Sequence, residues 1–133
     1  MRNNTGARVT GLVCMKCGRE FGPHDVTYTC NECGLEGILD VLYDYDEIAK
    51  TFSRSDLTDS RDNTHWRYLP LIPVGSRDSL PALKVGWTPL YERNGLLGIS
   101  RLFVKDDSAN PTASLKDRAS SVGVARAGAE GAS

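Results

Sequence analysis

Short apolar runs separated by polar stretches divide the first half of the chain into small predicted elements. Residues 26–29 and 38–43 are rich in β-branched and aromatic side chains, which predicts two strands. Residues 45–52 predict a short helix. Residues 53–63 are polar, with Leu57 as their only aliphatic residue, and this composition indicates a linker or an exposed loop.

Large apolar residues return in the second half. Residues 65–74 contain two prolines, which forbid a long regular element, so we expect a short helix followed by an extended piece. Residues 101–105 predict a strand, residues 106–111 a loop and residues 114–131 a helix. A strand, a loop and a helix in this order form half of a βαβ crossover.

The composition is that of a soluble globular protein, with 133 residues of which 40% are hydrophobic and 25% are charged. The net charge is -1 and both signs are mixed along the chain, so there is no electrostatic footprint for nucleic acid or for a membrane surface. No apolar run is long enough to span a bilayer, and residues 1–6 lack the apolar stretch of a signal peptide. We therefore expect a cytoplasmic protein.

All four cysteines lie in two Cys-x-x-Cys pairs, and we interpret them as metal ligands: Cys14, Cys17, Cys30 and Cys33. Gly18 and Gly34 follow the pairs, where the backbone must curl back toward sulfur. Four soft ligands with no open position favour structural zinc, with rubredoxin-type iron and metal-free knuckles as alternatives. His24 lies between the pairs, and we expect it to be a surface residue because the ion already has four ligands.

Lys116 is the most informative residue of the second half. Pro111 disfavours the continuation of a preceding helix, and Thr112 or Ser114 can cap a new one, so we expect Lys116 in its first turn. A cation there opposes the helix dipole, but a site that needs a less strongly protonated amine tolerates it. The alternative is an ordinary exposed lysine beside Asp117.

The sequence around Lys116 resembles a known signature. Residues 102–118 are similar to the cofactor-lysine segment of pyridoxal-phosphate enzymes with the tryptophan-synthase-β fold, also called fold type II, and most of all to that of threonine synthases. Residues 85–90 match the Gly-x-Thr-Pro-Leu motif of that group, and residues 66–70 resemble a stretch that precedes the motif in threonine synthases. A four-cysteine knuckle precedes the catalytic fold in some members.

The resemblance implies an α/β fold class with three parts. Residues 1–44 would form a zinc-ribbon-like module, residues 45–75 a linker with a short helix, and residues 76–133 the N-terminal part of the pyridoxal-phosphate domain. In the family, the phosphate cradle, the asparagine facing the phenolic oxygen and the residue at the pyridine nitrogen follow the lysine helix. We therefore expect a truncated N-terminal portion that is inactive alone, since one strand and one helix cannot build a doubly wound sheet.

The resemblance also assigns roles to single residues. Lys116 would form the Schiff base with pyridoxal phosphate and later move protons, and we expect burial and the positive helix end to lower the pKa of its amine. The turn around it would be shaped and anchored by three cofactor-site residues, Ser114, Asp117 and Arg118. Asn110 and Thr112 would position backbone or substrate, or else serve as turn and cap residues.

Three positions depart from the commonest family pattern: Ala113 replaces Gly, Leu115 replaces Phe and Asp107 replaces Glu. Each keeps the size class or the charge, and none removes the reactive amine. An alanine at position 113 further predicts that the backbone there needs no positive φ.

The resemblance implies a carbon–oxygen lyase, threonine synthase, which converts O-phospho-L-homoserine and water to L-threonine and phosphate. The substrate would be a small amino-acid phosphate, and the resemblance is compatible with a parent enzyme that forms a homo-oligomer. Related pyridoxal-phosphate enzymes such as cysteate synthase or threonine dehydratase are the alternative within this class. The alternative from another class is a zinc-ribbon module that binds a protein.

Overall fold

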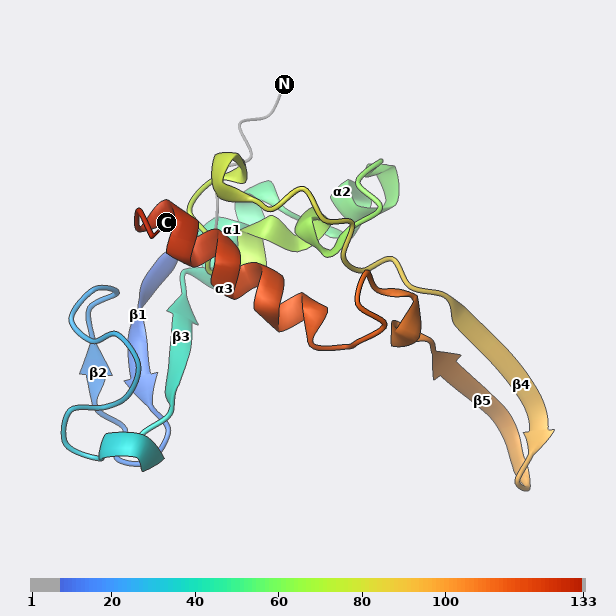
Figure 1. Cartoon of the computed structure of the whole chain (residues 1–133), viewed down its shortest axis with the longest axis horizontal. Coiled ribbons are helices and arrows are strands. Elements are labelled where there is room, and N and C mark those ends of the chain that lie inside the picture. The colour runs from blue at the N-terminus through green and yellow to red at the C-terminus, as the bar shows by residue number, and fades with distance from the viewer. Residues whose placement is uncertain (1–7, 133) are drawn as a thin grey trace.

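A computed structural model describes residues 8–132 and shows a small mixed α/β fold (Figure 1). Residues 1–7, where we expect no signal peptide, and Ser133 lie outside the described residues. The strands and α-helices are β1 (Val9–Cys14), β2 (Glu20–Phe21), β3 (Leu39–Tyr43), α1 (Tyr45–Thr51), α2 (Arg54–Asp59), β4 (Leu90–Leu96), β5 (Ile99–Lys105) and α3 (Asp117–Ala129). Short 3-10 helices span Gly34–Glu36, His65–Leu71, Arg77–Ser79 and Asp107–Ala109.

The N-terminal module is a three-stranded antiparallel sheet in the order β2-β1-β3. Strand β3 confirms the strand expected at residues 38–43, but the strand expected at residues 26–29 is wrong. Only Thr29 forms a bridge there, to Ile38. The chain is already turning into the second cysteine knuckle at this point, where the Cys30 N–H donates to the Gly37 carbonyl at 2.9 Å.

Two short helices follow the sheet. The expected helix at residues 45–52 is confirmed by α1, which Asp44 caps by accepting the Glu47 N–H at 2.9 Å. The loop expected at residues 53–63 is wrong, because α2 occupies its first half. The Asp56 carboxylate accepts the backbone N–H and the hydroxyl of Ser53 at 2.9 and 2.7 Å, and this closes the first turn without an apolar face.

The hydrophobic core lies between residues 65–74 and α3. The expected short helix followed by an extended piece is confirmed, since a 3-10 helix spans His65–Leu71 and Ile72 is extended. The core consists of Trp66, Leu69, Val74 and Ala125, with Ile72, Leu80 and Val122 packed against it. Residues 65–74, which precede the Gly-Trp-Thr-Pro-Leu motif, are thereby packed against α3, the helix that follows Lys116.

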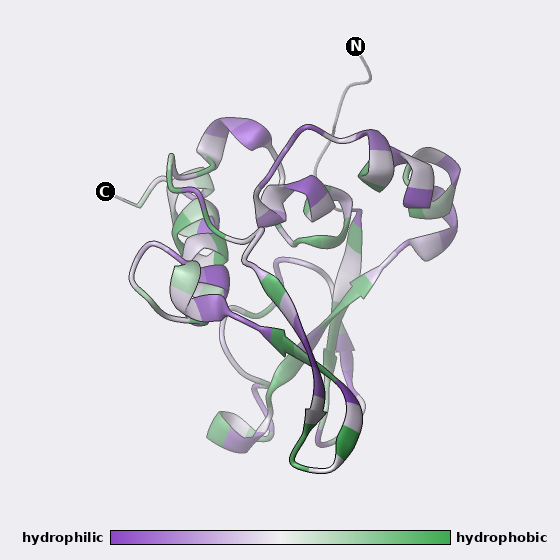
Figure 2. Cartoon of the chain, turned by 90° about the vertical axis from the view of Figure 1, so that its right-hand side faces the viewer, coloured by the Kyte–Doolittle hydropathy of each residue, from purple (hydrophilic) through white to green (hydrophobic). Residues whose placement is uncertain are grey.

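Strands β4 and β5 form a hairpin that extends away from the rest of the molecule (Figure 1). The expected strand at residues 101–105 is confirmed, but it pairs antiparallel with β4, so the described residues do not form a parallel crossover. Leu97 and Gly98 form the two-residue turn, both with positive φ. Figure 2 shows apolar residues along this hairpin, and the exposed ones are Leu90, Tyr91, Leu96, Leu97, Ile99, Phe103 and Val104.

Helix α3 begins three residues later and ends two residues earlier than the sequence predicts, at Asp117 and Ala129. Lys116 is therefore its N-cap residue and not part of its first turn. Neither expected cap is confirmed, because Lys116 occupies the capping position and no side chain caps the helix there. None of the helices within residues 8–132 combines the length and apolar character needed to cross a bilayer.

Candidate functional site

The four cysteines converge from two knuckles of the same build. In each knuckle, a glycine with positive φ donates its N–H to the carbonyl of the first cysteine, Gly18 to Cys14 and Gly34 to Cys30, both at 2.9 Å. The first cysteine of each pair is buried. All four Sγ atoms lie within 4.8 Å of one another, whereas His24 is exposed as expected.

The spacing of these four sulfur atoms fits a cation with tetrahedral coordination. Zinc–sulfur bonds of about 2.3 Å place the sulfurs of a tetrahedron about 3.8 Å apart, and the Sγ atoms of Cys17 and Cys30 are separated by 3.8 Å. A hydrogen bond from the Cys17 backbone N–H is the main cause that lowers the pKa of Cys14 to about 7. A hydrogen bond between the side chains of Cys33 and Cys17 is the main cause that raises the pKa of Cys33 to about 12. All four cysteines can be ionised together only when a cation lies between them.

Gly37 leaves no room for a side chain beside the cluster. A Cβ atom at this position would lie 2.6 Å from the Cys30 Cβ and 2.7 Å from the Cys33 Cβ. We predict that Gly37→Ala displaces both cysteines and lowers zinc affinity about tenfold or more, measured by competition with a chromophoric chelator. Gly123→Ala is the matched control, because a Cβ there meets open space. Equal zinc affinity in the Gly37→Ala variant would contradict this geometry.

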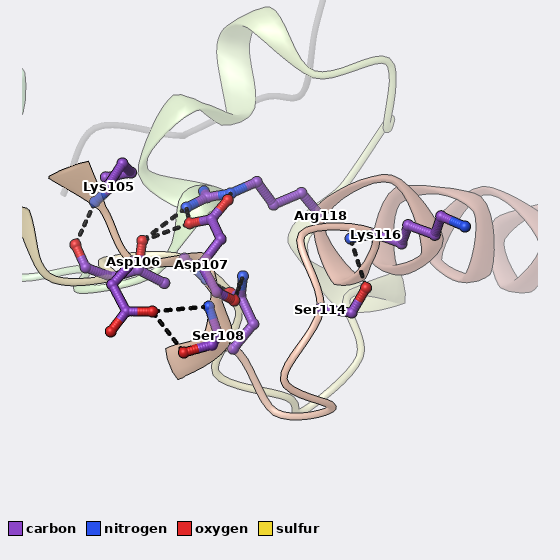
Figure 3. Close-up of polar contacts among 10 residues, drawn as sticks. Lys105, Asp106, Asp107, Ser108, Ser114, Lys116 and Arg118 are labelled. Atoms are coloured by element: carbon purple, nitrogen blue, oxygen red, sulfur yellow. Dashed lines mark hydrogen bonds and ion pairs between the residues drawn. The ribbon is translucent and has the colours of Figure 1, made fainter.

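Lys116 is exposed, and among residues 8–132 none takes a hydrogen bond or an ion pair from its ammonium group. Its backbone N–H donates to the Ser114 hydroxyl at 3.2 Å. Figure 3 shows the Lys116 side chain directed away from that of Arg118. Within the described residues, Lys116 is therefore not buried as we expected.

The turn before Lys116 contains a strained alanine. The Ala113 N–H donates to the Asn110 carbonyl at 2.9 Å, and Ala113 has a φ of 56°. The expectation that position 113 needs no positive φ is therefore wrong. The residues on both sides of Ala113 fix the turn, because the Thr112 N–H and hydroxyl both donate to the Asp117 carboxylate, at 2.8 and 2.5 Å. The backbone adopts the left-handed conformation although the side chain disfavours it.

We predict that Ala113→Gly stabilises the protein by about 1 kcal/mol, since glycine adopts this φ without strain. The measurement is the free energy of unfolding from chemical denaturation. Ala119→Gly provides a control of opposite sign, because it places glycine at an exposed position inside α3 and should destabilise by about 1 kcal/mol. If both variants lose stability equally, the strain at position 113 is refuted.

Arg118 points to the other side of the helix start and forms a network with the preceding loop (Figure 3). Its Nε and Nη2 donate to the two carboxylate oxygens of Asp107 at 3.1 and 2.8 Å. The Thr88 hydroxyl donates to the same carboxylate at 2.6 Å and accepts from Arg118 Nη2 at 3.2 Å. The bonds from Arg118, and then that from Thr88, hold the pKa of Asp107 well below its usual range.

The network extends into the interior through Asn110. The buried Asn110 side chain accepts the Gly86 N–H at 3.0 Å and donates to the Asp107 carbonyl at 3.0 Å. Gly86 has a φ of 89°, and a Cβ there would lie 2.8 Å from the backbone nitrogen of His65. The Gly-Trp-Thr-Pro-Leu motif is therefore clamped between this loop and the 3-10 helix of the core.

His65 and Ser121 complete the contact between the core and α3. The His65 Nε2 and the Ser121 hydroxyl are 3.1 Å apart, and the Ser121 hydroxyl lies 3.0 Å from the Arg118 carbonyl. Burial, and then the charge of Arg118, lowers the pKa of His65. Sequence reasoning missed Thr88 and His65 as members of this site. The sequence did contain a signal for both, because Thr88 lies within the motif at residues 85–90 and His65 directly precedes the stretch at residues 66–70.

The depressed pKa of Asp107 predicts a dependence of stability on pH. A carboxyl whose pKa is lower in the folded than in the unfolded protein contributes stability above its unfolded pKa of about 4, and this contribution is lost as the pH falls from there toward the folded pKa. The difference in unfolding free energy between the natural protein and Asp107→Asn should be constant at neutral pH and shrink below about pH 4. Denaturation at a series of pH values measures it, and a pH-independent difference would refute it.

The described residues thus combine a four-cysteine module with an α/β segment that ends in a lysine-bearing turn and helix. The chain is similar in sequence to two threonine synthases. The chain is 45% identical over 117 residues to the threonine synthase of Methanocaldococcus jannaschii, a match that covers 86% of this chain. It is 39% identical over 119 residues to the threonine synthase of Methanosarcina acetivorans, which covers 87% of this chain.

These matches confirm the resemblance to threonine synthases. The chain spans 28% of the length of each of these two relatives. No protein-family model matches the chain. No solved structure matches it either.

Proposed function

We propose that the protein carrying this chain is a threonine synthase, which converts O-phospho-L-homoserine and water to L-threonine and phosphate. The observation that supports it most is the identity of 45% to a threonine synthase over 86% of the chain. Residues 76–133 would be the N-terminal part of the pyridoxal-phosphate domain, and residues 45–75 the linker before it.

The lysine turn fits a covalently bound aldehyde cofactor in one clear respect. The Lys116 amine is exposed and has no partner among residues 8–132, so it is free to react with an aldehyde. Pyridoxal phosphate, when bound, would supply the electron sink for the reaction. Lys116 would hold the cofactor and move a proton at its Nζ, while Ser114, Asp117 and Arg118 keep the turn in place.

We further propose that residues 1–44 form a zinc-ribbon-like module with structural zinc. The separation of the four sulfurs matches a closed tetrahedral site, and no further ligand is required. Iron of the rubredoxin type uses the same ligands and remains the alternative metal. A cluster that uses all four cysteines as thiolate ligands favours a reducing compartment, from which we infer the cytoplasm.

The test is a substrate panel on the full-length gene product loaded with pyridoxal phosphate. O-phospho-L-homoserine should yield threonine and phosphate in equal amounts. Preferred turnover of O-phospho-L-serine with sulfite would instead indicate a cysteate synthase, and preferred conversion of threonine to 2-oxobutyrate a threonine dehydratase. A full-length product that binds zinc but turns over none of these would favour the protein-binding zinc ribbon.

A further inference from the structure

We propose that Asp107, Thr88 and Asn110 are positioning residues that fix the start of α3 and thereby set the direction of the Lys116 amine. We call these three residues together with Arg118 the latch. This inference rests on the proposed function, because it assigns the latch a role in presenting Lys116 to pyridoxal phosphate. None of the three proposed residues touches the amine itself.

Asp107 is the centre of the latch, because both carboxylate oxygens and the carbonyl oxygen of this residue accept hydrogen bonds. The carboxylate binds Arg118 of α3 through two bonds and Thr88 through one, and its carbonyl accepts from Asn110. The side chains of Asp107 and Arg118 are 25% and 34% exposed, so the pair is partly shielded from water. A bidentate and shielded pair of this kind fixes direction better than a single surface ion pair.

The helix start depends on this anchor. Lys116 is the N-cap residue and its side chain makes no capping bond, so the first turn of α3 is held by its neighbours. Asp117 is bound to Thr112 in the preceding turn, and Arg118 is bound in the latch. If either anchor is lost, the first turn is free to fray.

The direction of Lys116 follows from helix geometry. Successive helical residues are about 100° apart, so residues 116 and 118 point to nearly opposite sides. With Arg118 held toward Asp107, the Lys116 side chain must face the other side, as Figure 3 shows. Releasing Arg118 would let the first turn of α3 fray and would spread the amine over several directions.

Asn110 makes the latch rigid. It is 5% exposed and binds the Gly86 N–H, which ties the Gly-Trp-Thr-Pro-Leu motif to the loop that carries Asp107. Gly86 in turn lies against the His65 backbone, where no Cβ fits. Thr88 is buried in the same motif, so the hydroxyl that binds Asp107 has little freedom to move away.

The experiment uses the full-length gene product, stripped of cofactor and titrated with pyridoxal phosphate. Absorbance gives the dissociation constant, and the circular dichroism of the bound cofactor reports its fixed orientation. Asp107→Asn should raise the dissociation constant about tenfold and reduce the dichroism per bound cofactor at least twofold, because a misplaced amine reacts poorly. Asp107→Glu keeps the charge and should restore both values to within about threefold.

Asp106→Asn is the matched control, since that neighbouring carboxylate binds Ser108 and not Arg118. Thr88→Val tests the latch independently should Asp107→Asn fail to fold, and it should raise the dissociation constant about threefold. Wild-type affinity and dichroism in the latch variants would overturn the latch alone. A wild-type protein that binds no pyridoxal phosphate at Lys116 would overturn the proposed function, and with it the role of the latch.

Discussion

Lys116→Ala is expected to abolish the visible absorbance of the full-length gene product loaded with pyridoxal phosphate and to lower its turnover at least about a thousandfold. The reason is that the exposed amine is the group that would hold the cofactor and move the proton. Lys116→Arg should fail to the same degree, because it retains the positive charge but not a reactive amine. The measurements are an absorbance spectrum and an assay of phosphate release.

Lys84→Ala is the control for this prediction. Lys84 is exposed and lies shortly before the Gly-Trp-Thr-Pro-Leu motif, so its loss removes a lysine without touching the helix start. It should leave absorbance and turnover unchanged. If Lys116→Ala retained a normal cofactor spectrum, the cofactor would have to be held by another amine and the assignment of Lys116 would be wrong.

Cys30→Ser is expected to release the metal and unfold the N-terminal module, with a loss of more than about 4 kcal/mol in its free energy of unfolding. Cys30 is fully buried, and its backbone N–H and carbonyl both belong to the second knuckle. The module has little else to hold it, since its three-stranded sheet contributes no residue to the main hydrophobic core. Metal analysis and thermal unfolding measure the two effects.

The matched control is His24→Ala, which removes the exposed histidine between the two knuckles and should leave zinc content at one ion per chain. Removing the metal from the natural protein with a chelator should reproduce the effect of Cys30→Ser. Unchanged stability in the Cys30→Ser variant would show that the cysteines are not structural ligands.

The sequence predicted those features whose cause is local. A Cys-x-x-Cys pair encodes its own knuckle, because the glycine after it and the backbone bond to the first cysteine lie within five residues. Strand β3 and helix α1 were likewise predicted from patterns within single segments. Lys116 was singled out by its neighbours in the chain, and the structure places it at the start of α3.

Features that depend on distant partners could not be predicted. The positive φ of Ala113 is a different case, because its cause is local. The glycine that the family usually has at this position indicates a positive φ, and the alanine in its place concealed that signal. Asp107 was noted only as a departure from the family pattern, and its role emerges when Thr88 and Arg118 meet its carboxylate. Helix α2 was missed although its cause is also local, because the capping box of Ser53 and Asp56 is followed by no apolar face that would indicate a helix.

The most direct test of the central claim is to reduce the pyridoxal-phosphate-loaded, full-length gene product with borohydride and map the modified peptide by mass spectrometry. Reduction fixes the cofactor permanently to the amine that held it. The account predicts a single phosphopyridoxyl group on Lys116, in the peptide that also contains Leu115 and Asp117. Modification of a different lysine, or none at all, would contradict it.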